Sequence, residues 1–282
     1  MILVTGASGN VGAAVVNSLR TCRAAFRIGV HKPSEPLVEG DTASVLLDFL
    51  DPSTFRPATQ GCSAVFLLRP PAIANMRSTL VPFIDIAHEA GIRQIVFLSV
   101  AGAADNPLVP HHAVEQHLRH ESSGWTILRP GFFAQNLGDA YRDDILLNNC
   151  LFVPAGAGRV AFVDVRDVAD VAADALLGEA NQPGQAYTLT GPEAISFVSV
   201  AEILSSVVNR EIRYQPASIL AYFLHLKRRG MPVGQIIVQT ILHVGLRFGQ
   251  AGAVDTTLAT LLGHKPRGLR DYVQDHQHLW IR

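Results

Sequence analysis

The most constraining feature of the chain is three glycines, spaced three residues apart, that directly follow its first apolar run. The run Ile2–Val4 is typical of a buried parallel strand. Gly6 allows a tight turn, Gly9 lets the backbone approach a phosphate, and Gly12 leaves room for a helix to press on the sheet. Apolar residues at helical spacing follow: Val11, Val15, Val16 and Leu19.

This order of strand, glycine loop and helix predicts the pyrophosphate site of a bound dinucleotide, because the first amides of the helix would face the anion. The alternative is a glycine turn that binds nothing. We expect the following residues to contact the dinucleotide: Thr5, Gly6, Ser8, Gly9, Asn10, Val11 and Gly12.

Apolar runs recur along the first half of the chain, with helical patterns between most of them. The alternation predicts the α/β class, with a Rossmann-type doubly wound parallel sheet. The predicted strands are Ile2–Val4, Phe26–Val30, Val45–Leu47, Ala64–Leu68, Gln94–Leu98 and Thr126–Leu128. The intervening helices are expected to include Asn75–Glu89 and Pro110–His120.

After Gly131 the alternation loosens, and aromatic and amide residues become frequent. We therefore expect a dinucleotide-binding core over residues 1–150 and a smaller C-terminal substrate-binding lobe over residues 151–282. Segments near 160–210 are expected to return to the core sheet. Residues 216–254 are apolar and poor in acids, which suits a cap over an apolar site.

The composition excludes several classes of function. A net charge of −1 among 282 residues gives no field that would draw the protein to nucleic acid or to a membrane. The three cysteines lack metal or redox spacing, and we interpret them as buried thiols in a reducing compartment. The expected location is therefore the cytoplasm, as a monomer or homodimer without a metal site.

The end of the second strand decides between NAD and NADP, because a carboxylate there holds the ribose diol and a cation accepts the 2′-phosphate. This chain has His31 and Lys32, with no acid before Glu35. We favour NADP(H) over NAD(H), although the pair could also be two solvated side chains. After the third strand, Asp48 and Phe49 either bracket the adenine or begin the next helix.

Two further strand ends carry candidate ligand contacts, since ligands bind beyond the carboxyl ends of parallel strands. Leu68, Arg69 and Pro70 end the fourth strand and are expected at the cofactor. Ser99 ends the fifth strand, where it could bond a substrate oxygen or the nicotinamide amide, or could simply close a turn.

Four motifs together resemble the atypical short-chain dehydrogenase/reductases, specifically the NmrA-like group that includes triphenylmethane reductase, quinone reductases and NADPH-sensing regulators. The motifs are Thr5–Gly12, Phe97–Ser99, Trp125–Leu137 and Phe162–Val168. The resemblance covers about the first two hundred residues. It implies a nicotinamide cofactor and a ligand-binding lobe that varies between members.

The chain departs from the main short-chain family at its catalytic pair. That family uses a Tyr, with a Lys four residues later, to protonate a carbonyl. Here the corresponding helix offers His112 and Gln116, and the only lysines of the chain are Lys32, Lys227 and Lys265. His112 is the candidate acid, with His111 a weaker one, unless the imidazole only orders the pocket.

These observations favour a reductase that transfers hydride directly to an apolar, aromatic or quinone-like substrate. The alternative is a non-catalytic NADP(H)-sensing regulator that binds a protein partner. The residues expected along the substrate are Phe132, Phe133, Asn136 and Tyr141.

Overall fold

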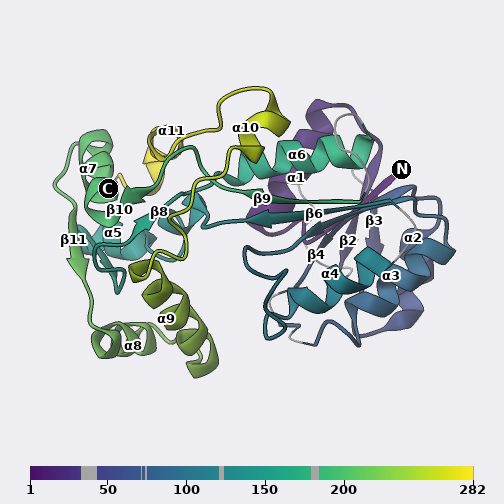
Figure 1. Ribbon diagram of the computed structural model, residues 1–282, viewed down its shortest axis with the longest axis horizontal. Coiled ribbons are helices and arrows are strands. Elements are labelled where there is room, and N and C mark those ends of the chain that lie inside the picture. Colours follow the sequence, from purple (N-terminus) through teal and green to yellow (C-terminus); the bar gives the residue numbers. More distant parts are fainter. Residues whose placement is uncertain (33–42, 71, 74, 121–123, 179–183, 282) are drawn as a thin grey trace. The chain divides into compact units, whose positions relative to one another are not determined.

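The computed structural model in Figure 1 describes residues 1–32, 43–70, 72–73, 75–120, 124–178 and 184–281. The chain forms two compact units. The first comprises Met1–Pro130, Val165–Leu189 and Thr260–Gly263, and the second comprises Gly131–Asp164, Thr190–Ala259 and His264–Arg282. The expected boundary at residue 150 thus lies within the second unit, and of the segment 160–210 only Val165–Leu189 belongs to the first.

The first unit is built on a seven-stranded parallel sheet, as the run of buried apolar segments predicts. The strand order is β3-β2-β1-β4-β5-β6-β9. The strands are β1 (Ile2–Thr5), β2 (Phe26–Val30), β3 (Ala43–Leu46), β4 (Ala64–Leu68), β5 (Gln94–Leu98), β6 (Gly124–Pro130) and β9 (Gln185–Leu189). The order reverses between β1 and β4, which is where doubly wound sheets bind their ligands.

Helices cover both faces of this sheet (Figure 1). Helices α1 (Asn10–Thr21) and α6 (Val165–Leu177) lie on one face, where the Ser18 hydroxyl donates to Asp170 at 2.7 Å. The other face carries α3 (Leu80–Glu89) and α4 (His111–His120) beside the short α2 (Phe55–Thr59).

Helix α3 is shorter than its apolar pattern predicts. The expected helix began at Asn75, whereas the structure begins it at Leu80. Thr79 has a non-helical backbone (φ −126°, ψ −69°), and its hydroxyl donates to the Asn75 carbonyl at 2.8 Å. The side chain thereby stabilises a turn in place of the first helical turns.

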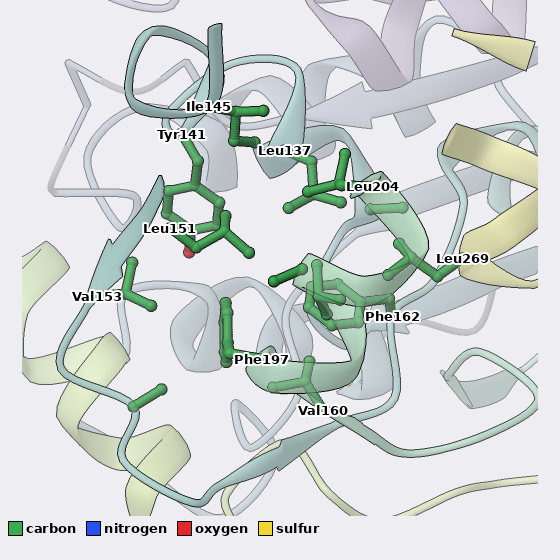
Figure 2. Close-up of a cluster of buried hydrophobic side chains, with 14 of the residues drawn as sticks. Leu137, Tyr141, Ile145, Leu151, Val153, Val160, Phe162, Phe197, Leu204 and Leu269 are labelled. Atoms are coloured by element: carbon green, nitrogen blue, oxygen red, sulfur yellow. The ribbon is translucent and has the colours of Figure 1, made fainter. Parts of the chain in front are cut away.

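The second unit has its own hydrophobic core. Figure 2 shows Leu137, Tyr141, Leu151, Phe162, Phe197 and Leu204 among the side chains that gather in it. The helices are α5 (Arg142–Asn148), α7 (Phe197–Val208), α8 (Ile219–Arg228), α9 (Val233–Arg247), α10 (Thr257–Leu262) and α11 (Leu269–Asp275). Two small sheets pair β7 (Cys150–Val153) with β11 (Arg213–Pro216) and β8 (Arg159–Val160) with β10 (Ile195–Ser196).

The cysteines differ from the expectation at one position. Cys62 and Cys150 are buried free thiols, and burial raises the pKa of each. Cys22 is exposed, because it caps the carboxyl end of α1 instead of facing the sheet. Among the helices that the structure describes, none has the length and hydropathy needed to span a bilayer.

Candidate functional site

A pocket of about 500 Å³ opens in the first unit at the carboxyl ends of β1 to β4. Its size is within the range of small-molecule and cofactor sites. The expected cofactor residues that line it are Thr5, Gly6, Ser8, Gly9, His31, Asp48, Phe49, Leu68 and Pro70. Apolar side chains that were not predicted complete the wall: Ala7, Ile28, Val30, Leu47, Leu50, Ala72 and Ile73.

The glycine loop forms one end of this pocket, and the start of α1 packs closely against the backbone of the loop. Gly6 has a φ of +68°, a conformation that favours glycine. A Cβ on Gly12 would lie 2.1 Å from the Gly6 carbonyl oxygen, so the start of α1 packs directly on the loop. A Cβ on Gly9 would meet only that oxygen, at 3.6 Å. The loop is therefore a backbone cradle open toward the pocket at Gly9 and closed at Gly12.

Thr5 holds this cradle to the neighbouring strand. Its hydroxyl donates to the Phe66 carbonyl at 3.0 Å and accepts the Leu68 amide at 2.8 Å. The hydroxyl is thus engaged by β4, and Thr5 meets the pocket as part of its wall. Asn10, Val11 and Gly12 lie in the first turn of α1, outside the pocket lining.

The segments that follow β2 and β3 bring His31 and Asp48 close together. The His31 Nδ1 lies 3.5 Å from the Asp48 Oδ1, with side chains that are 55% and 28% exposed. Asp48 also accepts the Leu50 amide at 2.9 Å, so its carboxylate is fixed at the rim. Lys32 is exposed and outside the lining. Residues 33–42, which include Glu35, lie outside the described part of the chain.

Phe49 and Arg69 are held by contacts within the unit. The Phe49 ring packs edge-on against Phe83, with centroids 5.3 Å apart, and also lines the pocket. The Arg69 Nη1 donates to the Ile73 carbonyl at 2.7 Å, and burial lowers the pKa of this guanidinium. Arg69 is outside the lining, where it fixes the loop that carries Ile73.

A buried carboxylate on α4, which the sequence did not predict, contacts the residue that follows β5. Glu115 is fully buried and accepts hydrogen bonds from the Ser99 hydroxyl at 2.5 Å and from the Arg129 Nε at 2.9 Å. Burial opposes its ionisation, but the bonds from Arg129 and Ser99 and the charge of Arg129 hold the pKa of Glu115 below its usual value.

The ionised carboxylate determines what Ser99 can do. A carboxylate only accepts hydrogen bonds, so the Ser99 proton is committed to Glu115. Ser99 can then offer a ligand its lone pairs but no donor. Ser99 is 1% exposed and lies outside the pocket lining, so its roles toward the nicotinamide amide, toward a substrate oxygen or in closing a turn stay predictions. The helical spacing of His111, Val114, Glu115 and Leu118 could have revealed the buried acid.

The two adjacent histidines of α4 differ in their partners. The His112 Nδ1 lies 2.8 Å from the Ala103 carbonyl oxygen, which can only accept. Its Nδ1 therefore carries the proton, and neutral His112 has only an acceptor at Nε2. His111 is buried, and its Nδ1 has no hydrogen-bond partner within the described residues.

The four residues expected along the substrate all belong to the second unit. Phe132 is half-buried and contacts Phe162 and His243 edge-on, and Phe133 pairs with Val163. Asn136 is half-buried in a short turn. Tyr141 is only 3% exposed, so it lies in the core shown in Figure 2.

The Tyr141 hydroxyl is engaged inside that core. It contacts the His243 Nε2, while the His243 Nδ1 lies 2.6 Å from the Gln239 carbonyl oxygen. The carbonyl requires the proton on Nδ1, so Nε2 accepts and Tyr141 donates. Burial raises the pKa of Tyr141 and lowers that of His243, which keeps both groups neutral.

Tyr141→Phe is expected to destabilise the protein by about 1–3 kcal/mol, because it leaves a buried acceptor on His243 without a donor. Urea denaturation compared with wild type measures this cost. Tyr214→Phe is the control, since Tyr214 packs against the same core and its hydroxyl donates a 3.3 Å bond to the Val153 carbonyl, not to a side chain. Equal losses in the two variants would contradict a special role for the Tyr141–His243 pair.

No group of three or more His, Cys, Asp and Glu side chains within the described ranges is arranged to hold a metal ion. The residues that are present fit a dinucleotide better. The glycine cradle has the chemistry that suits a pyrophosphate, and the apolar pocket suits an adenine ring. The polar rim at His31 and Asp48 suits a ribose.

Comparison with known proteins agrees with this geometry. The sequence profile described as NAD(P)H-binding matches residues 6–179. An NAD(P)H azoreductase of Xenophilus azovorans is 29% identical, over 98% of each chain. The NADPH-dependent quinone oxidoreductase of Escherichia coli, solved with NADPH, is 26% identical with a TM-score of 0.86, over 99% of this chain and 100% of that one. The triphenylmethane reductase of Citrobacter sp. shares the fold, with 23% identity and a TM-score of 0.85, over 97% and 98% of the two chains.

Proposed function

The chain belongs to the NAD(P)H-binding family and is an NAD(P)H-dependent oxidoreductase, and from this premise we propose that it is an NADPH-dependent reductase of small aromatic or quinone-like compounds. The observation that carries the proposal is the first-unit pocket, in which a glycine cradle at one end of α1 meets an apolar wall and a polar rim. The resemblance to quinone reductases agrees with the relatives that the chain matches, and the triphenylmethane reductase shares its fold.

We assign the cofactor to this pocket through three groups of residues. The amides of the loop from Gly6 to Gly12 hold the pyrophosphate. Asp48 and Phe49 flank the adenine and its ribose, and His31 with Lys32 meets the 2′-phosphate. Leu68, Pro70 and Ser99 continue the site toward the nicotinamide, where Ser99 accepts the carboxamide N–H. Arg69 acts by fixing the loop at Ile73.

The chemistry follows from the cofactor and from what the chain lacks. When bound, reduced nicotinamide supplies a hydride, that is, two electrons and one proton. We assign Gln116 to the position of the family lysine and His112 to that of the tyrosine. A quinone or conjugated dye stabilises the incoming electrons itself, so positioning contributes most of the catalysis. The second proton comes from water.

The relatives support this substrate class, since one is an azoreductase and another a quinone oxidoreductase. Phe132, Phe133 and Asn136 are half-buried and are the residues of the second unit that we assign to the aromatic substrate. Tyr141 supports them from the core. The three free cysteines support a cytoplasmic location, and we propose a monomer or homodimer.

Titration of the purified protein with NADPH and NADH, followed by nicotinamide fluorescence, tests the cofactor assignment. A panel of quinones, azo dyes and triarylmethane dyes is then added to the NADPH complex. Oxidation of the bound NADPH by one acceptor class is the expected result. Tight binding without oxidation by any acceptor would instead favour the NADP(H)-sensing regulator.

The double variant His31→Ala/Lys32→Ala is expected to weaken NADPH binding by about 10-fold or more and to change NADH binding little, because a charge-assisted contact to the 2′-phosphate is lost. The single variants show how much of the lost NADPH affinity is due to each residue. We expect His31 to contribute more, since it lines the pocket and Lys32 does not. Equal losses for the two cofactors would contradict the assignment.

A further inference from the structure

One acid and one base are found among the described residues that line the first-unit pocket, and they lie next to each other. The acid is Asp48, and the base is His31. The rest of the described lining is apolar side chains, glycines and the hydroxyls of Thr5 and Ser8. Lys32 is exposed and outside the lining. Any choice that this wall makes between ligands of different charge therefore depends on the pair.

The pairing of β2 with β3 brings the acid to the end of β2. The strands are parallel, with Val30 opposite Leu46, and the Leu47 amide donates to the Val30 carbonyl at 2.8 Å. The residues that follow the two strands therefore leave the sheet side by side, which places the Asp48 Oδ1 3.5 Å from the His31 Nδ1. Sites for NAD have a carboxylate at the end of β2, where it holds the ribose diol. Here β3 supplies a carboxylate to the same place.

The Asp48 carboxylate is fixed at the rim and still has an oxygen for a ligand. Its Oδ1 accepts the Leu50 amide at 2.9 Å. The contact with His31 involves the same oxygen, so the contacts with described residues leave Oδ2 for a ligand. The side chain is 28% exposed and lines the pocket, which makes it accessible from there. An ionised carboxylate only accepts hydrogen bonds, so it suits the hydroxyls of a ribose and opposes the oxygens of a phosphate.

We propose that Asp48 determines the cofactor specificity of this pocket, by binding the ribose diol of NADH and weakening the affinity for the 2′-phosphate of NADPH. The adjacent His31 can donate to a phosphate oxygen, so the pair offers one partner to each cofactor. The protein accordingly binds NADH as well as NADPH. This inference rests on the proposed function, because it concerns the dinucleotide assigned to this pocket.

The test is Asp48→Asn, which keeps an acceptor for the Leu50 amide but removes the charge and one of the two acceptor oxygens. We expect the Kd for NADH to rise about 10-fold or more, because hydrogen bonds to a charged group are lost. We expect the Kd for NADPH to fall about 5-fold, because a like charge no longer faces the 2′-phosphate. Asp48→Ser, whose hydroxyl can also accept that amide, is expected to change the two affinities in the same directions.

Asp51→Asn is the matched control. Asp51 accepts the amide of Ser53, two residues later, as Asp48 accepts that of Leu50, but it is exposed and outside the pocket lining. We expect this variant to bind both cofactors like the wild type. Fluorescence titration with NADH and NADPH gives the four affinities, and the melting temperature of each variant shows that it is folded.

The outcomes separate the inference from the proposed function. If Asp48→Asn weakens both cofactors equally, the carboxylate binds a part that they share, such as the adenine, and the inference is wrong while the proposed function stands. The same conclusion follows if the variant changes neither affinity, or if the wild type binds NADPH but not NADH. If the wild type binds neither cofactor, the proposed function and the inference both fail.

Discussion

Gly12→Ala is expected to abolish NADPH binding and to destabilise the protein by about 3 kcal/mol or more, which is the upper part of the range for overpacked sites. The added Cβ would lie 2.1 Å from the Gly6 carbonyl oxygen and 2.9 Å from the Ala7 amide nitrogen. Both atoms belong to the backbone, so no side-chain rotation relieves the clash. The glycine loop must move, and the amides that it presents to the pyrophosphate move with it.

Gly9→Ala is the matched control for this prediction. Its Cβ would meet only the Gly6 carbonyl oxygen, at an ordinary contact distance of 3.6 Å. We therefore expect the Gly9 variant to fold with near wild-type stability and still to lose NADPH affinity, because its methyl group projects where the pyrophosphate approaches. Urea denaturation and fluorescence titration separate the two effects. A Gly12 variant as stable as the Gly9 variant would show that the helix does not press on the loop.

Glu115→Ala is expected to cost about 3–5 kcal/mol of stability, because it leaves the Arg129 guanidinium largely buried without its counter-ion. The Arg129 side chain is 12% exposed and pairs with Glu115 through two hydrogen bonds. The variant also frees the Ser99 proton, so we expect a second loss, in nicotinamide binding. Thermal denaturation and NADPH titration measure the two.

The control for this pair is the exposed ion pair between Arg56 and Glu89. Its atoms are as close, at 2.8 Å, but the side chains are 64% and 63% exposed. Water screens such a pair, so Glu89→Ala is expected to cost less than about 1 kcal/mol. A similar cost for Glu115→Ala would mean that burial adds nothing to the Arg129 interaction.

Much of the first unit could be predicted from sequence because its central strands, β1, β4, β5 and β6, are buried on both faces. Such strands appear as continuous apolar runs, and the glycine spacing predicts which of them leads into the phosphate site. The strand order could not be predicted, since it depends on pairing between distant segments. The helix predicted from the sequence is longer than α3, because the apolar pattern continues through a turn that the Thr79 hydroxyl stabilises.

The sites were predicted less completely, for a different reason. Residues next to the glycine loop could be found because their role follows from backbone geometry. Glu115 could not be predicted, since its role depends on contacts with Arg129 in β6 and with Ser99 just after β5. Tyr141 was assigned to the substrate because aromatic residues surround it in sequence, but its hydroxyl faces His243, 102 residues away.

The path of the chain through the sheet has a consequence for biosynthesis. The first segment of the first unit ends at Pro130, and Val165–Leu189 later provide α6 and the seventh strand, β9. Until the ribosome has released those residues, β6 is an open edge that can pair with another chain, and α1 lacks its neighbour. A nascent chain halted before residue 165 therefore carries a formed glycine loop on an unfinished sheet.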